Sequence, residues 1–308
     1  ALSRMMSVNN QFAAAATHLL WGSAYPEDLF RARDKGYAKF VTKAHFWTHE
    51  SLSSSRSAIP PTFSGLETLE LHDTSLRSGT AGAIIPYLNA PLRNLTIWTE
   101  DESQVTEPKA NSRDNVWLKH VAKLESLTFE LLLDADPGEM VRIFKSMPQL
   151  KSLQLGEKTN RALDDAALLE ILTLPHLETL SLQYEISHNI IHVLESRSDK
   201  RPILPSIQRL DVCLLDGAGS APEKLLRGLT TLKSLEINIG NSGHNWQESK
   251  DDSVFASICT LEALQSLIVR LEPGLDVTEQ DFTALNRLQA LRALEISPIP
   301  RGFTNANN

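Results

Sequence analysis

A short apolar pattern, leucine-x-x-leucine-x-leucine with isoleucine, valine or phenylalanine as substitutes, constrains the fold of this chain more than any other feature. The pattern recurs nine times, starting at Leu66, Leu92, Leu124, Leu150, Leu177, Ile207, Leu232, Leu264 and Leu291. Successive copies lie about 28 residues apart on average, which is typical of a repeated structural unit. The sequence therefore predicts a chain of stacked repeats.

Each copy of the pattern predicts a short strand, because residues two apart in an extended chain face the same side. The last two apolar positions then point inward and their neighbours point outward. Between the strands, residues 165–172 and 222–229 carry apolar side chains at helical spacing, and Asp164, Asp251 and Thr278 are typical helix starts. One strand and one helix per repeat, always in the same direction, predict an α/β fold with a parallel sheet.

The repeats resemble the leucine-rich repeat family over residues 62–297. The resemblance implies a horseshoe-shaped solenoid with about nine to ten parallel strands on the concave face and helices on the convex face. Residues 38–46 are similar to a further, degenerate strand at the start of the sheet. We therefore expect a helical N-terminal cap over 1–37, the repeat domain over 38–297 and a tail over 298–308.

A second resemblance lies in the N-terminal segment, residues 1–24. Its apolar residues have helical spacing, and the run from Val8 to Trp21 resembles the closing half of an F-box, as found in fungal F-box proteins with leucine-rich repeats. The resemblance implies the substrate-recognition subunit of a cullin-RING (SCF-type) ubiquitin ligase. Its adaptor-docking residues would be Phe12, Leu19, Leu20 and Trp21. The opening half of the motif is not in this sequence, so we expect a longer natural chain.

The outward strand positions form two rows across the expected concave face, and these rows predict where a protein partner binds. The candidate residues on this face and its rim are Glu70, His72, Trp98, Glu130, Asp211, Glu236, Arg270 and Trp246. Most of the charges are acidic. Trp98 has two interpretations: an anchor for the partner, or a side chain covered by the loop 99–115.

Charge and composition narrow the class of partner. The net charge is −8 and lysine and arginine are not clustered, which argues against nucleic acid. No apolar run approaches the length of roughly 20 residues that crosses a bilayer, which argues against a membrane span. Only two cysteines, Cys213 and Cys259, are present, and this favours the cytoplasm or the nucleus.

No motif in the sequence indicates catalysis, a cofactor or a metal ion. His188 and His192 have the four-residue spacing of helical metal ligands, as do His45 and His49, but no third ligand lies nearby in sequence. The sequence therefore predicts a non-catalytic binding protein. The alternative is a repeat scaffold or an enzyme regulator, for example of the GTPase-activating type, with no connection to ubiquitin.

Overall fold

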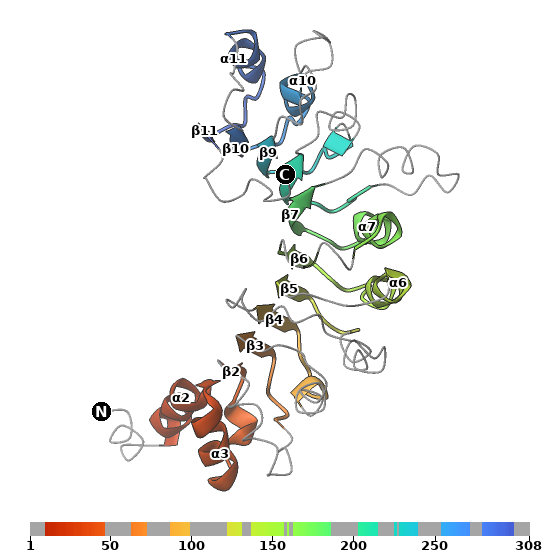
Figure 1. The fold of residues 1–308 in the computed structure, drawn as a ribbon. Helices are drawn as coiled ribbons and strands as arrows, with labels where there is room; N and C mark the ends of the chain where they lie inside the picture. Colours follow the sequence, from red (N-terminus) through yellow and green to blue (C-terminus); the bar gives the residue numbers. More distant parts are fainter. Residues whose placement is uncertain are drawn as a thin grey trace. The chain divides into compact units, whose positions relative to one another are not determined.

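The computed structural model divides the chain into two compact units, residues 1–150 and 151–308, and each unit is described by itself (Figure 1). Both units have an α/β architecture with parallel strands. The structure describes residues 10–46, 63–72, 87–98, 122–130, 137–156, 159, 163–185, 203–214, 225–226, 228–239, 254–271 and 279–298.

The first unit begins with helices and continues with strands. Its elements are α2 (Asn10–Trp21), β1 (Ser23–Ala24), α3 (Pro26–Asp34), a 3-10 helix η1 (Ala38–Phe40), β2 (Lys43–Phe46), β3 (Thr68–His72), β4 (Asn94–Trp98), β5 (Ser126–Glu130) and α6 (Pro137–Lys145). The strands β1 to β5 are parallel and follow one another across the sheet in sequence order.

The elements of the second unit are β6 (Ser152–Leu155), α7 (Asp165–Leu172), β7 (Thr179–Glu185), β8 (Arg209–Leu214), β9 (Ser234–Ile239), α10 (Val254–Ile258), β10 (Ser266–Leu271), α11 (Glu279–Leu285) and β11 (Ala293–Pro298). The unit contains strands β6 to β11, with helices described in the connections β6–β7, β9–β10 and β10–β11. Strands β6 to β11 are parallel, with consecutive strands as neighbours. In Figure 1, α7 lies to one side of β6 and β7, in the connection between them.

The predicted strands are confirmed, and so are their buried inward positions on β3 to β10. Every copy of the leucine pattern contains one of the strands β3 to β11. In the first unit Leu69, Leu95 and Leu127 are register partners, and all three side chains are buried. In the second unit the same ladder joins leucines of all six strands. Leucine stacked on leucine builds a core that extends along the repeat direction.

Strands β2 to β5 and β7 to β11 are entered through the same backbone arrangement, which explains why their register is uniform. Two consecutive N–H groups donate to one carbonyl oxygen of the preceding repeat. Gln208 and Arg209, for example, donate to the oxygen of Glu178 over 2.8 and 2.9 Å. The next repeat does the same, with Lys233 and Ser234 donating to Gln208. These bonds fix each turn relative to its predecessor and satisfy backbone groups that would otherwise be buried without a partner.

The helix signals are confirmed where the structure describes them. Helix α7 spans the predicted residues 165–172, and Asp164 caps it, with one carboxylate oxygen accepting from the Ala167 N–H over 2.7 Å. Of the predicted helix at 222–229, the described Leu225 and Leu226 are helical and buried, whereas Gly228 and Leu229 lie outside the helix, which is therefore shorter than predicted. Helix α11 begins at Glu279, directly after the Thr278 start signal.

The structure differs from the sequence prediction at three places. The sheet begins at β1, inside the segment predicted to be only helical, and residues 38–40 form a 3-10 helix before β2. A bulge in β7 brings Glu185, and not Gln183, opposite Cys213. The last leucine triplet is not buried like the others: the side chain of Leu294 is 45% exposed. Within the described residues, β10 is the only strand paired with β11.

Candidate binding face

The outward side chains of the parallel strands form the rows that the sequence predicts. In the first unit Glu70, Thr96 and Thr128 are register partners, and the next row joins His72, Trp98 and Glu130. In the second unit one row runs Ser181, Asp211, Glu236, Ile268 and Glu295, and the other includes Cys213, Asn238, Arg270 and Ser297. Except on β11, the inward neighbours of these residues are buried, whereas most described outward side chains stay partly exposed.

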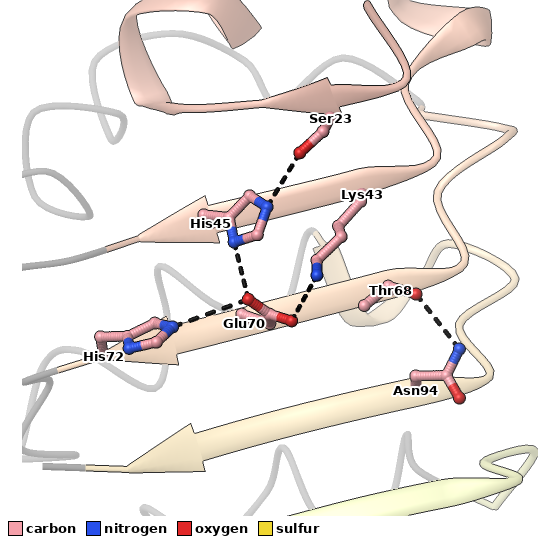
Figure 2. A network of polar contacts seen from close by, with 7 residues as sticks. All are labelled: Ser23, Lys43, His45, Thr68, Glu70, His72 and Asn94. Atoms are coloured by element: carbon pink, nitrogen blue, oxygen red, sulfur yellow. Dashed lines mark hydrogen bonds and ion pairs between the residues drawn. The ribbon is translucent and has the colours of Figure 1, made fainter. Parts of the chain in front are cut away.

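Five polar residues of β1, β2 and β3 form a connected group in the first unit, called here the His45 cluster (Figure 2). Its members are Ser23, Lys43, His45, Glu70 and His72. Glu70 is central: its Oε2 lies 2.7 Å from His45 Nδ1 and 3.7 Å from His72 Nε2. Its Oε1 accepts from the Lys43 ammonium at 2.6 Å. Ser23 Oγ lies 2.9 Å from the other ring nitrogen of His45, Nε2.

The sheet register explains why these residues meet. His45 and Glu70 are direct partners on β2 and β3, and His72 follows Glu70 on the same face two residues later. Lys43 precedes His45 by two residues on β2 and therefore also faces outward. Residues 25 or more positions apart in sequence thus lie on neighbouring strands, which are about 4.8 Å apart.

Burial and charge set the protonation of this cluster. Burial lowers the pKa of His45, and the smaller attraction of the Glu70 carboxylate opposes that effect. For Glu70, burial acts to raise the pKa, but the hydrogen bond from Lys43 and the charge of its ammonium group oppose this effect, and the pKa is below its ordinary value. Glu70 is therefore a carboxylate at neutral pH, while the charged form of His45 is disfavoured.

The N-terminal segment completes the cluster. Strand β1 supplies Ser23, and Tyr25 stacks on the His45 ring with a centroid distance of 5.2 Å. Sequence reasoning missed Ser23, Lys43 and His45 as site residues. A usable signal was present, because the alternation of Lys43, Ala44, His45 and Phe46 extends the outward rows to the degenerate strand.

A second polar group lies in the second unit and is called here the Asp211 cluster. It consists of Ser181, Asp211, Glu236 and Arg270. The Ser181 hydroxyl donates to Asp211 Oδ2 over 2.8 Å, and Arg270 forms an ion pair with Glu236. Burial raises the pKa of Asp211, and the neighbouring Glu236 carboxylate adds to the shift. The three charged residues here belong to the predicted face, and the structure brings them together.

The remaining predicted face residues are only partly described. Glu130 lies on β5 with a partly exposed side chain. Trp98 is the last residue of β4, but only its backbone belongs to the described part of the structure. Trp246 and the loop 99–115 lie outside the described residues. The two interpretations of Trp98 therefore both stand as hypotheses.

The predicted adaptor-docking residues all lie on α2, in different surroundings. Leu19 is 75% exposed and Leu20 is 37% exposed. Trp21 is buried and stacks on Tyr37 with a centroid distance of 5.6 Å, so its ring stabilises the N-terminal cap and is not accessible for docking. The Phe12 side chain lies outside the described residues. The accessible apolar surface of this helix therefore includes Leu19 and Leu20.

Of the four histidines considered as metal ligands from the sequence, only His45 lies within the described residues. His49, His188 and His192 lie outside the described residues, whereas His45 meets Glu70 and His72 in place of His49. One ligand atom from each of these three residues lies within 4.8 Å of the others. This is the one group of three or more potential metal ligands in the described part of the chain.

Comparison with known proteins gave no match, either to a family model or to a curated protein. Among the described helices, none has both the length and the apolar character that a membrane crossing requires.

Proposed function

We propose that this chain is a leucine-rich repeat solenoid that binds a protein partner through the outward faces of its parallel strands and has no catalytic activity of its own. The supporting observation is the contrast between the two sides of the strands. In each unit the inward leucines are buried, along β3 to β5 in the first and β6 to β10 in the second, while polar and charged side chains stand in partly exposed rows on the outward side of the strands. A parallel sheet is usually covered on both faces, so a polar open face is a natural binding surface.

The chemistry of the rows favours a protein partner. They combine hydroxyl, amide, carboxylate and guanidinium groups that lie close together but are not all used internally. The Asn238 side-chain oxygen, for example, is buried without a hydrogen-bond partner in the chain. A partner that supplies N–H or O–H donors would satisfy such an acceptor, whose unpaired burial costs about 1–3 kcal/mol.

The binding face is tested by placing a bulky charge on a row while leaving the core intact. Thr128→Arg changes the middle of the outward face of β5, where the threonine side chain is partly exposed. Thr283→Arg is the matched control: it makes the same substitution at an exposed threonine that lies on helix α11 and not on a strand. Quantitative affinity purification from cells, followed by mass spectrometry, compares both variants with the wild type.

We expect Thr128→Arg to deplete the specifically co-purified proteins at least tenfold, and Thr283→Arg to retain them. Equal retention by both variants, with unchanged melting temperatures, contradicts binding through the strand face. Depletion by Thr283→Arg alone places the partner on the helical side instead.

We further propose that the chain is the substrate-recognition part of an F-box subunit of a cullin-RING ligase. Two neighbouring exposed leucines on α2, Leu19 and Leu20, support this proposal, because exposed apolar side chains in a pair favour docking to another protein. The test is direct binding of the chain to the purified adaptor subunit, with Leu19→Asp/Leu20→Asp as the variant. Absence of wild-type binding, or equal binding by the wild type and the double variant, rejects the ligase assignment and leaves the repeat scaffold.

A further inference from the structure

Three side chains on β2 and β3 bring together two imidazoles and one carboxylate, a ligand set that proteins use for transition metals. His45, Glu70 and His72 each contribute one potential ligand atom, and these atoms lie within 4.8 Å of one another. Imidazole nitrogen suits zinc, copper, nickel and iron, and a carboxylate completes many such sites. Figure 2 shows the His45 ring and the nearer nitrogen of His72 turned toward the same oxygen of Glu70.

The separations of the ligand atoms can be compared with those of a tetrahedral metal site. A tetrahedral ion with bonds of about 2.0–2.2 Å holds its ligand atoms roughly 3.3–3.6 Å apart. His72 Nε2 lies 3.7 Å from Glu70 Oε2, close to that value. His45 Nδ1 lies 2.7 Å from the same oxygen, so metal binding requires this pair to open by less than about 1 Å.

His45 Nδ1 has unused bonding capacity in this cluster. It is buried and has no aligned hydrogen-bond partner, although Glu70 Oε2 lies 2.7 Å away. If Nε2 donates its proton to Ser23 Oγ, then Nδ1 of the neutral ring carries a lone pair that a cation can accept.

The surroundings of His45 and Glu70 resemble the outer shell of a metal site. A metal-bound histidine usually donates its second ring N–H to a neighbouring acceptor, which fixes the ring and the tautomer. Ser23 Oγ is in that position for His45 at 2.9 Å, and Tyr25 stacks on the ring. Lys43 holds the other oxygen of Glu70 at 2.6 Å, which leaves Oε2 to point at the histidines. Its positive charge also opposes a cation and therefore limits the affinity.

We propose that His45 Nδ1, Glu70 Oε2 and His72 Nε2 bind a divalent transition metal ion of the Zn²⁺ type on the outward face of β2 and β3. Three protein ligands leave a fourth position for water or for a donor from a bound partner. Because the ligands lie on neighbouring strands and Ser23 lies on β1, the ion links the N-terminal cap to the first repeats. The inference does not depend on the proposed function.

The test is a titration of the chelator-treated full chain with Zn²⁺ alone by isothermal calorimetry, and with Co²⁺ by visible absorption. We expect one equivalent at this site and a Co²⁺ ligand-field band typical of nitrogen and oxygen ligands. Glu70→Gln and His72→Gln should each weaken Zn²⁺ binding at least about a hundredfold, more than the loss of an outer-shell partner. Ser23→Ala, which keeps all three ligands, should weaken binding about tenfold.

The controls use the other histidines of the chain. His176→Gln changes an exposed histidine away from the cluster and should bind Zn²⁺ like the wild type. The double variant His188→Gln/His192→Gln removes the pair with helical ligand spacing and should also keep the site. Circular dichroism verifies the fold of each variant. If the chain binds no Zn²⁺, or if Glu70→Gln and His72→Gln bind with wild-type affinity, or if only the 188/192 variant loses binding, the site is wrong.

Discussion

Two leucines at the same repeat position, Leu267 and Leu294, give the sharpest test of how the repeats are stabilised. Both occupy the second leucine of the pattern, and they are register partners on β10 and β11. The sequence alone treats them as equivalent. In the structure, however, Leu267 is fully buried between β9 and β11, whereas Leu294 is 45% exposed. Replacing each by alanine should therefore give very different losses of stability.

The expected sizes follow from burial. Leu267→Ala removes buried methyl groups and leaves a cavity between two neighbouring strands, which costs about 2–5 kcal/mol. Leu294→Ala loses only about half of the free energy of transferring a leucine side chain out of water. The space that the substitution leaves is open to solvent, so no closed cavity forms. We expect a cost of about 1 kcal/mol. In a chain of stacked repeats an interior residue also stabilises two interfaces, and Leu294 contacts one.

The measurement is chemical denaturation of the full chain, with the midpoint and slope determined for both variants. Leu235→Ala, at the same position on β9 and equally buried, is a second interior variant and should match Leu267→Ala. If Leu294→Ala costs as much as the interior variants, then β11 is covered by another segment and the reasoning from exposure fails. If the interior variants cost less than about 1 kcal/mol, the core is not organised by this ladder.

Three further predictions concern single polar groups. Burial raises the pKa of Asp211 above its unfolded value, so ionisation of this carboxyl group destabilises the fold as the pH rises through the carboxyl range. Asp211→Asn should therefore raise the denaturation midpoint at neutral pH. This gain in stability should shrink as the pH is lowered toward about 3, where the carboxyl group becomes protonated. Lys43→Met should tighten Zn²⁺ binding severalfold in calorimetry, because it removes a positive charge beside Glu70; weaker binding contradicts that reasoning. Asp164→Ala should cost about 0.5–2 kcal/mol by removing the cap on Ala167 N–H, whereas Asp164→Ser should restore most of it in the same denaturation assay.

The sequence predicted the repeated part of the fold well, because the signal is redundant. Each strand carries the same leucine spacing, and a strand of period two has only one way to bury both leucines. The two-residue β1 has no such pattern, and its position follows from tertiary contacts of Gly22, whose oxygen accepts from Thr42 and Lys43. The exposure of Leu294 could not be predicted from the sequence either, because it depends on which segments lie beside the strand and not on the strand's own residues.

The candidate face was predicted in position but not in its contacts. Asp211, Glu236 and Arg270 were identified as outward residues, and the register confirms that orientation. Their pairing was not predictable from the list of charges, because Arg270 lies 34 residues beyond Glu236. Glu70 was identified as part of an acidic surface, but Lys43 on the preceding strand neutralises it. The degenerate strand was expected, but its outward residues were not counted in the rows, and this changed the expected charge at that end.

Because the parallel strands are in register, an outward residue lies closer to the equivalent residue of the next repeat than to most residues that are near it in sequence. Side chains in one row are separated by about 4.8 Å from strand to strand, within the range of strong Coulomb interaction. Asp211 and Glu236 are such partners and repel each other, so this pair persists only because Ser181 donates on one side and Arg270 binds on the other. The effect of an outward substitution is therefore set by the two neighbouring strands. Substitutions in adjacent repeats of one row should be non-additive, whereas those several strands apart should add.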